Sequence, residues 1–239
     1  MPGLKHFSFL ILYFLLLTAW AKSVFSQNVF FGSDETGIYS SELDIVNGSK
    51  WYYENKFKGN LFLYEGGFTE GSVLFNGELF SNLTLAFELF HNELILIKKV
   101  DNENRELVLN ENFVERFTLK NAANTNELTF VRKKLSGVDG IKYYHAVYNG
   151  ITTCYIHHKK IIKNKVAGNY LGEYLYRPVI YIKRGEDFRG CTNKRSFLRL
   201  FEDQNGLLRK YIRRNNLSID GRNPLHIAQV LEYYDSLAL

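Results

Sequence analysis

Side chains that could carry chemistry are few and scattered in this sequence of 239 residues. His157 and His158 are adjacent, but neighbouring residues on a strand point to opposite faces and do not easily chelate one ion. His145 lies between Tyr144 and Ala146 in an aromatic run, which favours a structural histidine with a hydrogen-bond partner. The sequence therefore predicts no metal site and no catalytic histidine.

The remaining patterns do not favour an enzyme. Asp34-Glu35 and Glu186-Asp187 are acidic pairs typical of turns, because adjacency along the chain does not pair two carboxyl groups for acid–base work. The sequence has no His-Glu-x-x-His, Gly-x-Ser-x-Gly, phosphate-binding glycine loop or Cys-x-x-Cys. We therefore expect no cofactor and no catalytic residues.

Cys154 and Cys191 are the two cysteines of the chain. In an oxidising compartment they would be expected to form a disulfide with each other. Two buried free thiols are the alternative, because a disulfide needs a Cα separation of ~5.5 Å that a sequence does not reveal.

The first 26 residues have the pattern of a signal peptide. Lys5 and His6 precede the apolar run Phe7–Trp20, and either Ala19-Trp20-Ala21 or Val24-Phe25-Ser26 suits a cleavage site. We expect cleavage after Ser26. The run is shorter than the ~20 residues that span a bilayer, so we expect a mature chain without a transmembrane span. The sequence thus predicts an exported protein that is periplasmic or associated with the cell envelope.

Positive charge gathers near the C-terminus. Residues 189–222 hold nine Lys or Arg against three acids, whereas the whole sequence has a net charge of +5. A helix is expected over residues 204–214, with Asp203 as its cap and Leu207 in its apolar stripe. Its polar face would present Arg209, Lys210, Arg213 and Arg214.

These four basic residues are the candidate binding residues. The expected partner is an anionic envelope component or an acidic protein, attracted by a field focused on one side of the molecule. A solvated helix face is the alternative, since charge runs often have no partner. Nucleic acid is not expected, because aromatic residues do not alternate with these arginines. No oligomeric state follows from the sequence.

Elsewhere an alternation with a period of two indicates strands. Between Asn82 and Leu89 the odd-numbered residues are apolar, so one face should be buried and the other wet. The residues expected in water are Asn82, Thr84, Ala86 and Glu88. Asn76-Gly77 and Asn149-Gly150 tolerate positive φ and predict hairpins. Leu94–Ile97 is apolar on both faces, which predicts a strand covered on both sides.

About a dozen short strands predict an α+β protein that is mainly antiparallel β, as a curled sheet, barrel or sandwich. Residues 159–165 are expected to form a polar connection. The expected organisation is a signal peptide over residues 1–26, an antiparallel β domain over 27–188 and a helical segment over 189–239 packed on that domain.

Several short motifs together suggest a family. They are Asn47-Gly48, Gly71-Ser72-Val73, Asn76-Gly77, Phe87-Glu88-Leu89, residues 193–197 and Tyr233-Tyr234. In these motifs the chain resembles secreted or periplasmic β-rich proteins of Bacteroidetes without a known activity, although that family commonly has Tyr-Asp in place of Phe87-Glu88. The resemblance implies an exported envelope protein and supplies no catalytic residues.

The function expected from the sequence is therefore binding or assembly in the envelope, without catalysis. The alternative is an extracytoplasmic, hydrolase-like enzyme whose site is assembled from separated strands. Converging polar groups with shifted pKa values in a pocket would favour the enzyme, and an open basic or aromatic face would favour the binding protein.

Overall fold

The computed structural model describes residues 49–51, 56–100, 102–120, 127–164 and 170–237, which belong to one compact unit. The expected signal peptide and its cleavage position lie outside these residues. Within the described part, none of the helices has the length and apolar character needed to cross a bilayer.

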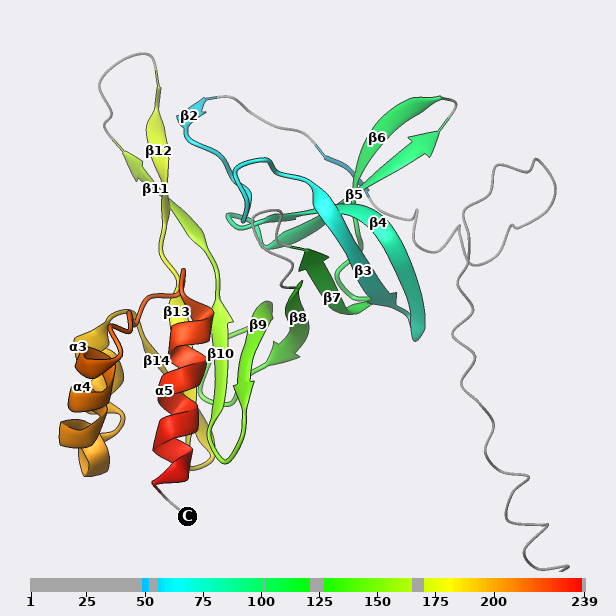
Figure 1. Ribbon diagram of the computed structural model, residues 1–239. Coiled ribbons are helices and arrows are strands. Elements are labelled where there is room, and N and C mark those ends of the chain that lie inside the picture. Colours follow the sequence, from blue (N-terminus) through cyan, green and yellow to red (C-terminus); the bar gives the residue numbers. More distant parts are fainter. Residues whose placement is uncertain (1–48, 52–55, 101, 121–126, 165–169, 238–239) are drawn as a thin grey trace, which may run out of the picture. The chain divides into compact units, whose positions relative to one another are not determined.

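Eleven of the described strands form one antiparallel sheet, whose edge strands β1 and β14 do not pair with each other (Figure 1). In spatial order the strands are β1 (Ser49–Lys50), β6 (Glu103–Val108), β5 (Glu93–Val100), β4 (Glu78–Glu88), β3 (Thr69–Phe75), β7 (Val114–Lys120), β8 (Glu127–Lys134), β9 (Ile141–Asn149), β10 (Thr153–His157), β13 (Val179–Arg184) and β14 (Asp187–Cys191). The predicted α+β class is confirmed, with an open, curled sheet.

A smaller sheet and the helices complete the described fold. The smaller sheet contains β11 (Lys160–Asn164), β12 (Gly172–Tyr176) and β2 (Phe57–Lys58). The helical elements are α3 (Lys194–Arg199), the 3-10 turn η2 (Glu202–Gln204), α4 (Asn205–Arg214) and α5 (Pro224–Ser236).

The predicted hairpin between β3 and β4 is confirmed, since Asn76 and Gly77 have φ of 50° and 80°. The predicted alternation is confirmed in the part of β4 where Thr84 is exposed and Leu85 is buried. It is wrong at the end of β4, because Ala86 and Glu88 are both 0% exposed. There Phe62 pairs with Glu88 in an isolated bridge, so the chain before β3 lies beside this part of the strand.

One face of the large sheet carries a continuous row of cross-strand partners. From β3 to β14 the row consists of Val73, Phe117, Phe130, His145, Ile156, Ile180 and Cys191. All seven are buried, and His145 is the polar one. Because residues in register share a sheet face, the hydrophobic residues of both ends of the sheet lie on the same side.

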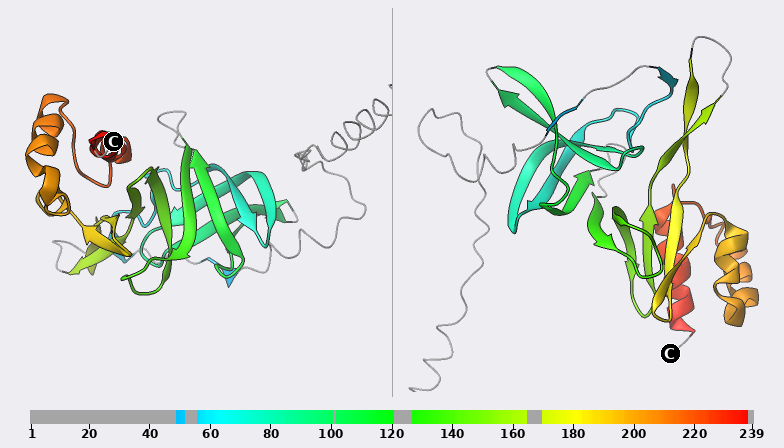
Figure 2. Two further views of the ribbon diagram at one scale, coloured as in Figure 1. Left: turned by 90° about the horizontal axis from the view of Figure 1, so that it is seen from below. Right: turned by 180° about the vertical axis from the view of Figure 1, so that it is seen from behind.

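Two hydrophobic cores cover that face. In the first, which we call the sheet core, the rings of Phe87, Phe117 and Phe130 have centroids 4.7 to 5.2 Å apart. The strands around it curl, as Figure 2 shows. In the second, the helix core, α3, α4 and α5 cover β10, β13 and β14 through Phe197, Leu208, Ile212, Ile227 and Leu231, among others.

Four expectations for the C-terminal part need correction. Residues 160–164 form β11 rather than a polar connection, because β12 supplies a ladder of backbone hydrogen bonds. The expected boundary between residues 188 and 189 falls inside β14. Asp203 does not cap α4, which begins without a side-chain cap, and instead accepts a hydrogen bond from Tyr234. Leu207 is 42% exposed, outside the buried stripe of Leu208 and Ile212.

The last turn of α5 is tied to the β9–β10 hairpin by Asp235, which is 6% exposed. Its carboxylate accepts hydrogen bonds from the backbone N–H of Thr152 at 3.0 Å, the Thr152 hydroxyl at 2.6 Å and the Tyr148 hydroxyl at 3.0 Å. A Cβ at Gly150 would displace the Tyr148 and Asp235 oxygens from their present positions, so glycine allows this close approach. A carboxylate is unfavourable at a helix C-terminus, and these donors compensate for that position.

We expect Asp235→Ala to lower the free energy of unfolding by about 3 kcal/mol, because it leaves buried donors without an acceptor. Glu232→Ala on the exposed face of α5 is the matched control, with a change within about 0.5 kcal/mol. Urea denaturation of both variants measures the difference. A loss below about 1 kcal/mol for Asp235→Ala would show that this contact does not hold the helix.

Candidate functional site

A cavity of about 1070 Å³ opens where the two cores meet. Leu63, Tyr64 and Leu128 in its wall pack against the sheet core, whereas Val147 packs against the helix core. The first turn of α5 and the residues before it complete the wall. The cavity therefore draws on strands, connections and a helix that are far apart in the sequence.

His145 enters this cavity wall from the middle of β9. In the cross-strand row its neighbours are Phe130 and Ile156, so a polar ring lies between two apolar residues. His158 follows the end of β10, and its Nε2 lies 3.1 Å from His145 Nδ1. Both histidines are 4% exposed. The predicted hydrogen-bond partner of His145 is thus confirmed, and the residue also lines the cavity.

The chain of hydrogen bonds continues to Tyr176 at the end of β12, whose hydroxyl lies 2.5 Å from His158 Nδ1. Burial lowers the pKa of His145 to about 4 and, with help from His145 and His157, lowers that of His158 well below its usual value. Burial raises the pKa of Tyr176. At neutral pH all three groups are therefore uncharged.

A neutral imidazole donates from one nitrogen and accepts at the other. The hydrogen bonds that link His145, His158 and Tyr176 must therefore all run in the same direction. If Tyr176 donates to His158, then His158 donates to His145 and the Nε2 of His145 carries a proton. In the opposite direction the Tyr176 hydroxyl hydrogen is free. Among the described residues, His145 Nε2 makes no hydrogen bond, so either direction leaves a polar group available in the cavity wall.

Lys160 looks like a ligand-binding cation but is already saturated. Its ammonium donates to the Asn60 backbone oxygen at 2.6 Å, the Asn60 side-chain oxygen at 2.6 Å and the Phe62 backbone oxygen at 2.9 Å. Burial lowers its pKa, while Glu88 and Glu65 act in the opposite direction. Lys160 therefore fixes the 60–62 segment as one wall of the cavity.

The opposite rim contains groups that remain available. The Arg222 guanidinium lies 4.9 Å from the centre of the Tyr176 ring and pairs with Asp220 at 3.0 Å, but its side chain is 61% exposed. His226 accepts a hydrogen bond from the Ser218 N–H at Nδ1, so its other ring nitrogen carries a proton that it can donate. Burial raises the pKa of Tyr64 to about 12, and its hydroxyl has no partner within the described part.

Polar groups with shifted pKa values converge in this cavity, but its described wall does not contain the parts of a nucleophilic triad. No Ser, Thr or Cys is among the described residues that line the cavity, and no carboxylate hydrogen-bonds to His145 or His158 there. A nucleophile activated by a histidine, and a histidine oriented by an acid, are both absent from this wall. The wall instead combines apolar side chains with hydrogen-bonding groups, which include the carboxylates of Glu65 and Glu127.

His157 and His158 point to opposite faces, as predicted. His158 contacts His145, whereas the His157 ring lies 5.7 Å from that of Tyr144 on the other side of the sheet. Burial lowers the pKa of His157 to about 4, with a further effect from Lys142 and Lys159. The two rings therefore belong to different environments.

The candidate binding residues Arg209, Lys210, Arg213 and Arg214 all lie on α4 and are all exposed. Arg209 donates to the Asn205 side chain at 2.5 Å. The buried residues of the same helix, Leu208 and Ile212, face the helix core. The basic face is thus displayed as expected, and it is separate from the cavity, whose lining includes none of these four residues.

Cys154 and Cys191 are free and buried in the helix core. They lie on β10 and β14, and β13 runs between those strands. Two inter-strand spacings of ~4.8 Å put the Cα atoms at least ~9.6 Å apart, beyond the reach of a disulfide. Burial raises the pKa of both thiols, for Cys191 to about 12. The geometry favours the alternative of two unreactive buried thiols.

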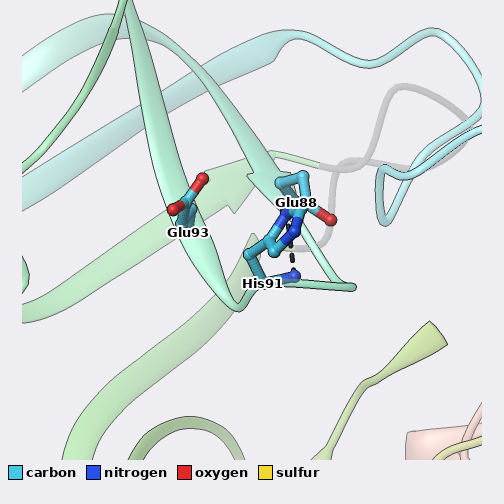
Figure 3. Close-up of side chains that lie close together, drawn as sticks. All are labelled: Glu88, His91 and Glu93. Atoms are coloured by element: carbon cyan, nitrogen blue, oxygen red, sulfur yellow. Dashed lines mark hydrogen bonds and ion pairs between the residues drawn. The ribbon is translucent and has the colours of Figure 1, made fainter. Parts of the chain in front are cut away.

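A second group of polar side chains gathers at the β4–β5 turn, where Figure 3 shows Glu88, His91 and Glu93. Glu88 accepts hydrogen bonds from the backbone N–H of Phe90 at 2.5 Å and of His91 at 3.0 Å, and it lies 2.7 Å from His91 Nδ1. Burial and the nearby Glu88 raise the pKa of Glu93, with Glu111 adding to the effect and His91 opposing it. This group was not predicted from the sequence, because the alternation along β4 places Glu88 on the wet face.

The buried histidines make the free energy of unfolding depend on pH. An unfolded histidine binds its proton near pH 6.5, but His145 and His157 do so in the folded protein only near pH 4. Stability is therefore lost as the pH falls from about 6.5 to about 4, because the unfolded chain binds protons first.

His157→Phe should keep the aromatic packing and reduce that loss by about 2 kcal/mol between pH 7 and pH 4.5. Urea denaturation of wild type and variant at both pH values measures the difference. The same loss in both proteins would contradict the neutral, buried state of His157.

Comparison of the chain with protein-family models, with curated proteins and with solved structures found no match. The resemblance to secreted Bacteroidetes proteins therefore stays a prediction from short motifs.

Proposed function

We propose that this chain is an exported, non-catalytic binding protein of the cell envelope whose ligand occupies the cavity beside His145 and His158. Export is the expectation from the first 26 residues. The cavity is the observation that carries the proposal, because its volume of about 1070 Å³ matches the upper range of small-molecule sites.

The lining suggests the chemistry of the ligand. Leu63, Leu128 and Val147 offer an apolar surface, while Arg222 and the free ring nitrogen of His226 offer donors on the opposite rim. Both donors favour an acceptor or a negative charge. The favoured ligand is therefore an organic molecule with an apolar body and an anionic group that lies near Arg222 rather than beside Glu65 and Glu127, which also line the cavity.

The basic face of α4 supports the envelope part of the proposal. Four exposed cations on one helix attract an anionic component of the envelope, either a lipid head-group or an acidic protein. Such attraction weakens between low and physiological salt, since exposed charges are screened over ~8–10 Å.

A hydrolase-like enzyme is the alternative, and one observation favours it. The chain from His145 through His158 to Tyr176 connects two points of the cavity wall through neutral groups that can pass a proton. Turnover of ester, glycoside or phosphoester substrates by the wild type, with loss of at least about 100-fold in Tyr176→Phe, would favour the enzyme over the binding protein.

The cavity proposal predicts saturable binding of 1-anilinonaphthalene-8-sulfonate, which combines an aromatic body with an anionic group. Gln229→Trp should weaken this binding at least about tenfold, because Gln229 is exposed on α5 and lines the cavity. Glu232→Trp, exposed on the same helix but outside the cavity lining, is the matched control and should bind as wild type does.

Arg222→Gln should weaken binding of the sulfonate but not of the uncharged analogue N-phenyl-1-naphthylamine. Fluorescence titration measures all four proteins, with near-ultraviolet circular dichroism to confirm native packing. Equal binding to the two tryptophan variants would place the probe elsewhere and overturn the cavity proposal.

The α4 proposal predicts co-sedimentation with anionic vesicles at low salt and little with neutral vesicles. Changing Arg209, Lys210, Arg213 and Arg214 to Gln should abolish it. The control removes four exposed charges elsewhere, at Lys99, Lys134, Lys183 and Arg189. Retention by acidic protein in an envelope extract, without vesicle binding, would assign the face to a protein partner. Identical behaviour of the two variants would leave α4 as a solvated face.

A further inference from the structure

Glu88, His91 and Glu93 place one possible metal-ligand atom each within 4.8 Å of one another. Glu88 ends β4, His91 lies in the turn and Glu93 begins β5 (Figure 3). Within the described ranges, no other group of three or more His, Cys, Asp or Glu residues meets this condition. The three residues have the spacing Glu-x-x-His-x-Glu. The tight turn between β4 and β5 reverses the chain and so brings the two ends of this segment together.

Glu88 is held in place before any ligand arrives. The residue is 0% exposed, and the turn donates two backbone N–H groups to its carboxylate. Such outer hydrogen bonds orient a ligating carboxylate and are common around metal sites. Glu93 is the direct cross-strand partner of Glu88, so two like charges lie opposite each other. A cation between them removes that repulsion.

The adjoining cavity gives an independent indication of a ligand. It has a volume of about 500 Å³ and is lined by His91, Asn92, Glu93, Glu111 and Tyr143, among others. Tyr143 is 1% exposed, yet its hydroxyl makes no hydrogen bond within the described part. The side-chain oxygen of Asn92 is also buried without a partner there. Buried polar atoms are normally satisfied, so two of them in one cavity indicate a missing polar group.

We propose that Glu88, His91 and Glu93 bind a divalent transition-metal ion, with Zn²⁺ as the best fit. One imidazole nitrogen and two carboxylate oxygens are ligands that Zn²⁺ accepts, and water takes the fourth position. The imidazole disfavours Mg²⁺ and Ca²⁺, which prefer oxygen ligands alone. The Tyr143 hydroxyl and the Asn92 oxygen supply hydrogen-bond partners for water in the cavity.

The geometry needs only side-chain adjustment. A tetrahedral ion with bonds of ~2.0 Å holds its ligand atoms ~3.3 Å apart. The present distance between Glu88 Oε2 and His91 Nδ1 is 2.7 Å, and the third ligand atom lies within 4.8 Å. His91 is 58% exposed in its side chain, so its ring can move outward while the buried Glu88 stays fixed.

The test is calorimetric titration of the purified, untagged chain with Zn²⁺, together with the visible absorption of Co²⁺ added in its place. One ion per chain and the absorption bands of four-coordinate Co²⁺ are expected. His91→Gln and Glu93→Gln should each weaken binding at least about tenfold. Glu111→Gln removes the same charge from the same cavity wall without removing a ligand, and should change the affinity less than about twofold.

Circular dichroism confirms that each variant is folded. The absence of saturable one-to-one binding at millimolar Zn²⁺ would overturn the proposal. Binding that survives in both ligand variants would assign the ion to another part of the chain. An equal loss in all three variants would show general attraction to negative charge, and would overturn it as well.

Discussion

The fold depends on one constraint, which is that an open antiparallel sheet of this length must cover one entire face. The cross-strand row from Val73 to Cys191 shows that the buried face is continuous through seven strands. At one end the sheet covers this face by curling, so that rings such as Phe117 and Phe130 stack on each other. At the other end the helices supply the cover.

The part of the sheet face covered by curling and the part covered by helices adjoin at His145, and the cavity lies at this boundary. A polar ring in an apolar row needs a partner, because an unpaired buried polar group costs about 1–3 kcal/mol. His158 provides it and is itself bonded to Tyr176. Burial keeps both histidines neutral, which avoids the larger cost of a buried charge. Hydrogen-bonding groups thus remain at a place where neither core fills the space.

Local sequence signals predicted the parts of this fold that local chemistry determines. Asn76-Gly77 forms the expected hairpin because both residues accept positive φ, and Leu94, Ile95 and Leu96 are buried on both faces as their run predicted. The strand β11 could not be predicted from its basic residues, because its stability comes from pairing with β12. Asp203 resembles a helix cap, but a distant tyrosine binds it instead.

The candidate sites were less predictable than the strands, for a physical reason. His145, His158 and Tyr176 come from three different strands or their ends, and register alone decides that they touch. The alternation predicts Glu88 on the wet face, yet the residue is 0% exposed where Phe62 pairs with it in an isolated bridge. The Glu-x-x-His-x-Glu spacing across the β4–β5 turn was the one signal that a search for ligands brought together by turns would have found.

A neutral, hydrogen-bonded pair of histidines lies between the two cores on one sheet face. Nitrogen-15 NMR of the imidazole rings at pH 5.5 tests it most directly, because a histidine with its usual pKa near 6.5 is protonated there. We expect neutral rings for His145 and His158, each with one protonated and one bare nitrogen. Two protonated nitrogens on either ring at that pH would contradict it.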